Sequence, residues 1–224
     1  MWCCLVGSEM CIRDRTRMML HKVFYVPIFT FRFEKHDTYD FSDIAKQGKI
    51  DSRPKGWTTP VNSSFPNISD NDRLISPDVR DSLIKDLSEQ MKRLFISNGI
   101  PDKFVVHNFW YNVYHDYQGQ EPHTHLTGCM EQTPYWCGIY YNKGATPTTF
   151  FRPDSNNRVH QFPYQSENFR EYFADSLQPN LHDGDVILFP PYLMHCVDLQ
   201  TSANMRLTFS FNLLLHNEQR VPLG

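Results

Sequence analysis

The chain has 224 residues, enough for one ordinary domain. About 40% of the residues are hydrophobic and 14% are aromatic, so a sizeable core can be buried and general disorder is excluded. Lys and Arg number 22 against 25 Asp and Glu, which leaves no basic excess for a protein that holds nucleic acid mainly through phosphate contacts. No apolar run approaches the roughly 20 residues that cross a bilayer, which argues against a membrane-spanning chain.

The first 17 residues differ in character from everything that follows. They lack the basic start and the long apolar run of a signal peptide, and VGSEMCIRDR resembles a translated sequencing adapter. We therefore expect residues 1–17 to be a non-native leader, with Met18 or Met19 as the native start. Residues 18–224 are then expected to form a single domain.

Half of the six cysteines fall in this leader. The others have no Cys-x-x-Cys spacing that would indicate a zinc site or a disulfide framework, and they predict reduced thiols in a cytoplasmic protein. These three are Cys129, Cys137 and Cys196.

Three segments follow the leader in chain order. Residues 21–34 (HKVFYVPIFTFRFE) are β-branched and aromatic and predict a strand that Pro27 breaks or confines to an edge. A short helix is predicted over 37–49, ending at Gly48. Residues 50–76 are rich in Pro, Ser, Asn and Asp and predict a long surface connection.

A long helix is predicted next. Ser76 is a suitable N-cap and Pro77 a suitable first helical residue, apolar residues then recur at helical spacing, and Asn98-Gly99 ends the pattern. We expect this helix to pack on the outside of a sheet.

Residues 103–216 change to a β pattern. Short runs rich in Val, Ile, Phe, Tyr and Trp alternate with turn residues, which predicts an all-β sandwich or barrel on a mostly helical N-terminal support. The runs are FVVHNFWYNVY, WCGIYYN, TTFFRP, NRVHQF, GDVILFP, LMHCVDL and MRLTFSFNLLL.

Three histidines within this region have the spacing of a metal site. His123 and His125 lie in EPHTHLTG, and residues two apart on a strand point to the same face. His195 follows about 70 residues later, beyond a Gly-Asp turn and a strand that looks buried. Two ligands close together and one distant ligand would place a metal between two strands of a barrel.

Other polar side chains accompany the histidines. Arg206 lies in an apolar strand, where its burial would require an anionic partner such as a small dicarboxylate. Asn112 and Tyr114 share one strand face upstream of His123, and both carry hydrogen-bond donors suited to carboxylate oxygens.

The ordered set HTH…WCGIYY…GDVILFPPYLMHCV…MRLTFSFN resembles the Fe(II)/2-oxoglutarate-dependent oxygenase superfamily over about residues 105–214. The resemblance implies a double-stranded β-helix (jelly roll, cupin-like) as the fold. It implies Fe(II) held by His123, His125 and His195. It also implies 2-oxoglutarate held by Arg206, helped by Asn112 or Tyr114.

The activity implied is hydroxylation of a C–H bond by O2, with release of succinate and CO2. The substrate class is left open between a small molecule and a peptide, and a homodimer is allowed for. Aromatic side chains would wall the substrate site, with plain barrel core as the alternative. These aromatic residues are Trp136, Tyr140 and Phe189.

The sequence departs from the family pattern at His125, where a carboxylate is usual. Either a three-histidine site or another oxygen ligand would complete the metal centre. Glu121 has the strand parity of His123 and is the first alternative ligand, and Asp198 is the second.

Two other functions remain alternatives. GDVILFPPYLMH also resembles the second cupin motif, which would indicate a metal enzyme that does not use 2-oxoglutarate. Arg206 discriminates between the two, because a cupin has no need of it. The third interpretation is a catalytically silent jelly-roll protein with a binding or structural role.

Overall fold

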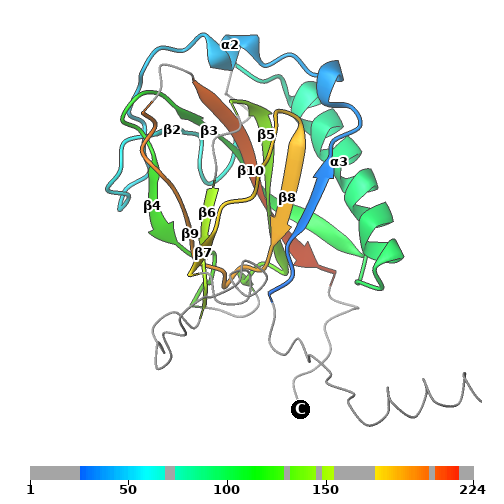
Figure 1. The fold of residues 1–224 in the computed structure, drawn as a ribbon. Helices are drawn as coiled ribbons and strands as arrows, with labels where there is room; N and C mark the ends of the chain where they lie inside the picture. Colours follow the sequence, from blue (N-terminus) through cyan, green and yellow to red (C-terminus); the bar gives the residue numbers. More distant parts are fainter. Residues whose placement is uncertain are drawn as a thin grey trace, which may run out of the picture.

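The chain folds into a mainly β structure, known here from a computed structural model (Figure 1). The leader, Cys129 and the strand expected at 157–162 lie outside the residues that the structure describes. The described residues are 26–68, 74–128, 132–144, 148–153, 175–201 and 205–216.

Two antiparallel sheets form the body of the molecule and together confirm the predicted double-stranded β-helix. The larger sheet has the strand order β1-β8-β5-β10-β3-β2, and the smaller has the order β4-β9-β6-β7. The strands are β1 (Phe29–Arg32), β2 (Asn62–Ser63), β3 (Phe104–Tyr114), β4 (Gln120–His123), β5 (Trp136–Lys143), β6 (Thr148–Phe151), β7 (Ser176–Leu177), β8 (Asp185–Phe189), β9 (His195–Val197) and β10 (Arg206–Leu215).

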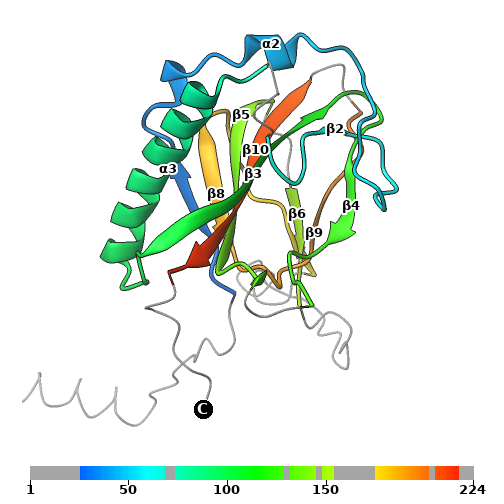
Figure 2. The ribbon, with the colours of Figure 1, turned by 180° about the vertical axis from the view of Figure 1, so that it is seen from behind.

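The predicted long helix is present as α3 (Pro77–Ser97). The Ser76 side chain accepts a hydrogen bond from the Val79 N–H, as expected of an N-cap. Leu83, Leu87, Met91 and Phe95 form the buried face of the helix. The helix lies against the outside of the larger sheet, on the side away from β4, β6 and β9 (Figures 1 and 2).

The sequence predicted that the N-terminal region would be a mostly helical support, but this region also contributes strands to the larger sheet. It supplies both edge strands of the larger sheet, because β1 pairs with β8 and β2 pairs with β3. Within the described part of the strand predicted over 21–34, β1 begins at Phe29, after Pro27, which has no N–H to donate to a ladder. In place of one helix at 37–49, the chain forms a 3-10 helix, η1 (His36–Thr38), and a short α2 (Ser42–Ala45).

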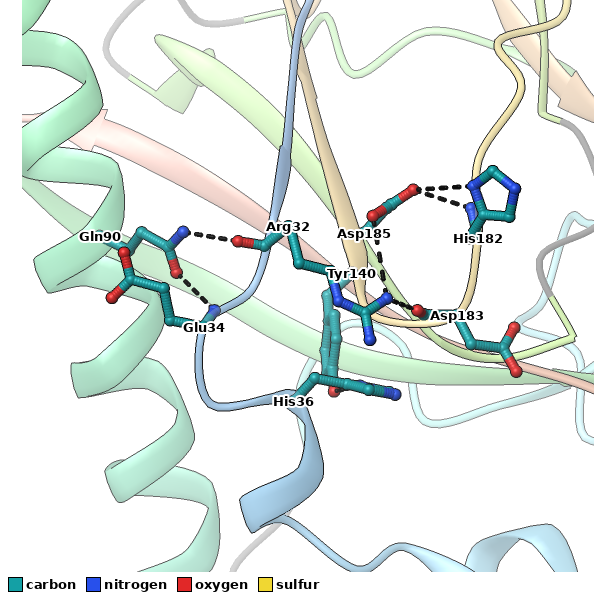
Figure 3. Close-up of polar contacts among 8 residues, drawn as sticks. All are labelled: Arg32, Glu34, His36, Gln90, Tyr140, His182, Asp183 and Asp185. Carbon is teal, nitrogen blue, oxygen red and sulfur yellow. Dashed lines mark hydrogen bonds and ion pairs between the residues drawn. The ribbon is translucent and has the colours of Figure 1, made fainter.

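Polar contacts tie β1 to its neighbours on both sides (Figure 3). The Gln90 side chain on α3 donates to the Arg32 carbonyl at 2.6 Å and accepts from the Glu34 N–H at 3.1 Å. The Arg32 guanidinium lies 4.0 Å from the Asp185 carboxylate and donates to the Asp183 carbonyl. A short edge strand is thereby held at both its helix side and its sheet side.

Successive side chains along β10, in the larger sheet, point to opposite faces of the sheet, and these two faces differ in character. On β10, Leu207, Phe209, Phe211 and Leu213 belong to the core shared with α3. The residues between them are polar and point between the two sheets, and all are buried. They are Arg206, Thr208, Ser210 and Asn212.

No helix among the described residues is both long enough and apolar enough to cross a membrane.

Candidate functional site

The three predicted histidines come together between the two sheets. One ring nitrogen from each of His123, His125 and His195 lies within 4.8 Å of the others. The ring centroids are 4.2 Å apart for His123 and His195, 5.4 Å for His123 and His125, and 5.2 Å for His125 and His195. Three imidazoles at this spacing can converge on one ion.

The smaller sheet and one loop contact position these rings. His123 and His195 are direct partners across the antiparallel β4–β9 pair. His125 follows the end of β4, and its backbone N–H donates to the Pro191 carbonyl at 2.9 Å. The loop that precedes His195 therefore also holds the extended segment that carries His125.

The hydrogen bonds of all three rings leave the same nitrogen available for a metal. Nδ1 of His123 donates to the Glu121 carbonyl at 2.9 Å, and Nδ1 of His195 donates to the Leu193 carbonyl at 2.9 Å. Nδ1 of His125 donates to Oδ1 of Asn212 at 2.7 Å. Because each acceptor is an oxygen that carries no proton, the proton of each neutral ring is on Nδ1 and Nε2 has a free lone pair.

Burial keeps these rings uncharged. It lowers the pKa of His125 to about 4, with a smaller contribution from the neighbouring His123. Burial also lowers the pKa of His123, and it lowers that of His195 well below the ordinary histidine value. A neutral imidazole is the form that binds a metal, so the triad is in its ligand state at neutral pH.

A row of side-chain amides supports His125. Asn212 on β10 accepts from the His125 ring, and its own Nδ2 donates to Oδ1 of Asn108 at 3.2 Å. Asn108 Nδ2 in turn donates to Oδ1 of Asn67 at 3.4 Å. In this arrangement the Asn212 oxygen faces the ring and Nδ1 of His125 carries the proton.

A bulge in β4 decides which neighbour of His123 points inward. The register with β9 shifts between Gln120 and His123, so these two residues both face the site although they are three apart. Gln120 lies with its Nε2 3.3 Å from Nε2 of His123.

Strand parity predicted that Glu121 would face the triad with His123. The bulge instead turns Glu121 away from the triad. Its carboxylate accepts from the backbone N–H groups of Thr58 at 2.8 Å and Thr59 at 3.2 Å. Burial raises its pKa, but these hydrogen bonds outweigh burial and the net pKa is lowered. Asp198 is also elsewhere, since it accepts from the Thr149 hydroxyl and the Gln178 amide.

Arg206 is buried on the same inner face, with a relative exposure of 1%. Its Nη2 donates to the Thr148 hydroxyl at 3.1 Å, and the guanidinium lies 5.0 Å from the Tyr114 ring centre and 5.1 Å from that of Tyr141. Its Nε and Nη1 have no hydrogen-bond partner within the described structure. A buried guanidinium without a carboxylate is costly, so the geometry suits an anionic ligand.

The two helpers expected beside Arg206 have different surroundings. Tyr114 is fully buried, pairs with Arg206 across the β3–β10 ladder, and donates its hydroxyl to Oε1 of Gln120 at 3.1 Å. Asn112 is also buried, but its amide contacts the Ser63 and Ser210 hydroxyls. Tyr114 therefore lines the cavity, whereas Asn112 lies on the same strand face and contacts Ser210, a residue of the cavity lining.

Two of the three expected wall residues belong to the core instead. Trp136 and Tyr140 lie on the face of β5 that packs against α3 and β1, and the Tyr140 hydroxyl bonds the ring of His36 at 2.7 Å (Figure 3). The cause is strand parity, because the inner face of β5 carries Cys137, Ile139 and Tyr141. Phe189 does face the site, with its ring centre 4.6 Å from that of His195.

The aromatic residues that border the triad came mostly from segments that the sequence did not single out. Trp57 and Phe65, in the connection before α3, lie with ring centres 5.6 Å apart, and Phe65 lies 5.0 Å from Trp110. Trp57 is 6.3 Å from His123, and Trp110 is 6.0 Å from His125. The three aromatic rings therefore connect His123 to His125 through a continuous series of ring contacts on one side of the site.

One small cavity joins the triad to the arginine. The polar row of β10 gave only a weak sequence signal, the alternation of polar and apolar residues in RLTFSFNL, and Gln120 and Thr148 were not singled out by the sequence. The cavity is lined by Trp110, Tyr114, Gln120, His123, His125, Ile139, His195, Val197, Arg206, Thr208 and Ser210.

Comparison with known proteins gives a family match over the β core and a similar fold. Residues 108–212 match the family described as "Putative 2OG-Fe(II) oxygenase". No curated protein matches the chain. The fold is similar to that of HygX from Streptomyces hygroscopicus with nickel and 2-oxoglutarate bound, at a TM-score of 0.54 and 11% identity, covering 94% of this chain and 87% of that chain.

Two further structures are similar at the same level. The iron-bound form of HygX from Streptomyces hygroscopicus has a TM-score of 0.51 and 11% identity, covering 94% of this chain and 86% of that chain. The non-heme alpha ketoglutarate dependent epimerase SnoN, from nogalamycin biosynthesis, has a TM-score of 0.55 and 10% identity, covering 94% and 81%. At these identities the likeness shows the fold.

Proposed function

We propose that the chain is an Fe(II)/2-oxoglutarate-dependent oxygenase that hydroxylates a C–H bond of a small-molecule or peptide substrate, a proposal supported by the family match over residues 108–212 and by the similarity of fold. Fe(II) and 2-oxoglutarate are the cofactor and co-substrate, and O2 is the oxidant. The observation that carries the proposal is the unpaired, buried guanidinium of Arg206 in the same cavity as three metal-ready histidines.

The donor set fits a ferrous ion. His123, His125 and His195 present three neutral nitrogens to one place, and imidazole is a ligand that iron accepts readily. Three protein ligands leave coordination positions open for small molecules. None of the three is a carboxylate, so the full double charge of the ion remains available to attract an anion.

The other end of the cavity fits a carboxylate. Arg206 is fully buried, and its Nε and Nη1 lack acceptors, which the oxygens of an anionic ligand would supply. The Thr148 hydroxyl and the faces of Tyr114 and Tyr141 hold the guanidinium in place. A dicarboxylate would therefore have one end at the metal and the other at Arg206.

In this superfamily, Fe(II) and 2-oxoglutarate supply an oxidant by coupling O2 reduction to the decarboxylation of 2-oxoglutarate to succinate and CO2. The chain's own residues hold and orient the reactants. Asn212 and the carbonyls of Glu121 and Leu193 aim the three rings, and Phe189 and Trp110 shield the site from water. Trp57 and Phe65 border the side from which a substrate would contact the metal.

A cupin-type metal enzyme without 2-oxoglutarate would use the same triad. It would leave the charge of Arg206 uncompensated in the core, which is why we favour the 2-oxoglutarate enzyme. A silent jelly-roll protein would have no use for three rings held in one tautomer around a single point.

The decisive experiment adds 2-oxoglutarate to the anaerobic Fe(II)-loaded full chain. We expect the visible metal-to-ligand charge-transfer band of a chelated 2-oxoacid. A folded, iron-loaded sample without this band would overturn the proposal and favour the cupin alternative. Failure to take up iron at all would favour the silent jelly roll.

Two variants assign the roles within that experiment. His195→Ala removes a ligand that is only 3% exposed, and we expect it to lose stoichiometric iron. Arg206→Ala should keep iron and require far more 2-oxoglutarate to produce the band. Unchanged 2-oxoglutarate affinity in Arg206→Ala would remove this residue from the co-substrate site.

A further inference from the structure

Gln120 is a polar side chain beside the triad whose position the proposed function does not explain. The bulge in β4 turns it into the cavity, where it is 9% exposed. Its amide spans the space between His123 and Tyr114, and so it links the metal end of the cavity to the arginine end. A bulge that turns a polar residue into a site at the cost of ladder hydrogen bonds indicates a use for that residue.

The hydrogen bonds define how the amide is oriented without a metal. Nδ1 of His123 carries the ring proton, so its Nε2 accepts a hydrogen bond from Nε2 of Gln120 at 3.3 Å. The Tyr114 hydroxyl donates to Oε1 at the other end of the amide. The amide N–H is thus aimed at the lone pair that a metal would use.

A cation on His123 would make this orientation unfavourable. The N–H of Gln120 would lose its acceptor and point toward a positive charge. Rotation of the amide by half a turn exchanges its nitrogen and oxygen, and the Tyr114 hydroxyl can accept a hydrogen bond as well as donate one. The rotated amide therefore keeps its contact with Tyr114 and presents Oε1 to the metal.

The distance between the Gln120 amide and Nε2 of His123 is that expected between two ligand atoms on one ion. Metal–ligand bonds of about 2.1 Å place neighbouring donor atoms about 3.0–3.4 Å apart, for octahedral and tetrahedral angles respectively. The amide atom that faces His123 already lies 3.3 Å from Nε2. We propose that Oε1 of Gln120 is a fourth protein ligand of the metal in the absence of 2-oxoglutarate, and supplies the oxygen donor that His125 does not.

This inference rests on the proposed function for the identity of the metal and the co-substrate. Three imidazoles and one amide oxygen leave two positions on a six-coordinate ion, which is the number that a chelating 2-oxoacid takes. The neutral amide oxygen is the weakest donor of the four and is the ligand that a further molecule displaces. Gln120 would then occupy the metal until the other reactants bind.

The test measures the affinity of the full chain for Co(II), as a redox-stable probe, and for anaerobic Fe(II). We expect Gln120→Leu to bind either ion at least about tenfold more weakly, and its Co(II) ligand-field spectrum to change. Gln120→Glu, nearly isosteric, should bind the metal more tightly than the wild type. Thr208→Val is the matched control, because Thr208 lines the same cavity on β10, and its affinity and spectrum should not change.

The outcomes separate the two proposals. Wild-type metal affinity and spectrum in Gln120→Leu would overturn the ligand role. A loss confined to 2-oxoglutarate affinity would also overturn it, and would assign the amide to the co-substrate instead. Weaker metal binding in this variant, together with no 2-oxoglutarate band in the wild type, would support the ligand role while refuting the proposed function. Should Gln120→Leu fail to fold, unaltered affinity and spectrum in Gln120→Glu would overturn the ligand role.

Discussion

The two faces of β10 have opposite chemistry over the same ten residues. The outer face carries Leu207, Phe209, Phe211 and Leu213, and packs into a continuous apolar core with α3. The inner face carries Arg206, Thr208, Ser210 and Asn212, all buried, yet two of these residues contact the groups that we assign to ligand and metal binding.

This difference separates stability from function within a single strand. The outer residues are stabilised by packing against the other apolar side chains of the core, because apolar contacts need no specific partner. The inner residues are polar and buried, and Arg206 retains unpaired nitrogens. Substitutions on the outer face should therefore change the free energy of unfolding, whereas substitutions of Arg206 and Asn212 on the inner face should change binding. Four predictions test this contrast, beginning with the largest expected effect.

Phe209→Ala should reduce the free energy of unfolding by about 3–5 kcal/mol. Phe209 is fully buried, with ring centres 4.5 Å from Phe41 and 5.6 Å from Phe109. Denaturant unfolding measures the loss, and the folded fraction should still bind one metal ion. Phe209→Leu is the control, with a smaller loss. A selective loss of metal binding at full stability would contradict the separation of the faces.

The metal-free protein should lose stability as the pH falls from about 6.5 toward 4. Burial lowers the pKa of His125 from 6.5 to about 4, so the unfolded chain takes up a proton first in this range. Stability is therefore complete above the unfolded pKa and declines below it, by about 3 kcal/mol for His125 alone. Denaturant unfolding at several pH values measures the decline.

His125→Gln is the control for that decline. Carboxylates with lowered pKa values, such as Glu121, also lose stabilisation at low pH, so only the difference between wild type and variant reports the histidine. The variant should show a shallower dependence between pH 6.5 and 4. Identical slopes would show that His125 is not held neutral by the fold.

Arg206→Met should leave the metal-free protein equally stable or more stable, because it removes a buried charge that lacks a carboxylate partner. The wild type with Fe(II) should gain about 2.7 kcal/mol from 2-oxoglutarate at one hundred times its Kd, and the variant should lose this gain. Anaerobic thermal unfolding with and without 2-oxoglutarate measures both effects. A strongly destabilised metal-free variant would indicate that Arg206 has a structural role.

Asn212→Leu should weaken metal binding by about 10- to 100-fold with little change in stability, because it removes the acceptor that orients His125. Direct metal titration measures the affinity. Asn212→Asp keeps an acceptor oxygen and should retain most of it. Equal affinity in Asn212→Leu and the wild type would mean that the amide row through Asn108 does not position the ring.

Much of the fold followed from local patterns. The period of 3.6 in residues 77–97 and the Ser76 cap predicted α3, the short β runs predicted an all-β sandwich or barrel, and the family resemblance implied the double-stranded β-helix. These signals are local, because the spacing of apolar residues along one element decides which side of it can be buried. The edge strands β1 and β2 were harder to predict, since Pro27 and the short pairing of Asn62–Ser63 weaken the local signal.

The residues of the candidate site also divide into those that the sequence predicted and those that it did not place. His-x-His, the distal His195 and the buried Arg206 were expected from spacing and from the cost of an arginine in an apolar strand, and the structure brings all four residues to one cavity. For Trp136 and Tyr140 the sequence left substrate wall and barrel core as alternatives, and the structure places both in the core, because alternation distinguishes two faces without stating which one faces the site. That choice depends on which sheet and which helix pack on each side.

The sequence by itself predicted the resemblance to the oxygenase superfamily, the histidines and the arginine, because each depends on residue identity at a set spacing. Only the tertiary structure decided that Gln120 faces the histidine triad and Glu121 does not. A one-residue bulge in β4 reverses the face to which the side chains before the bulge point. The tertiary structure also decided that Asn212 holds His125, since that contact joins residues 87 apart in the chain. Such contacts depend on strand pairing, which no local pattern in the chain specifies.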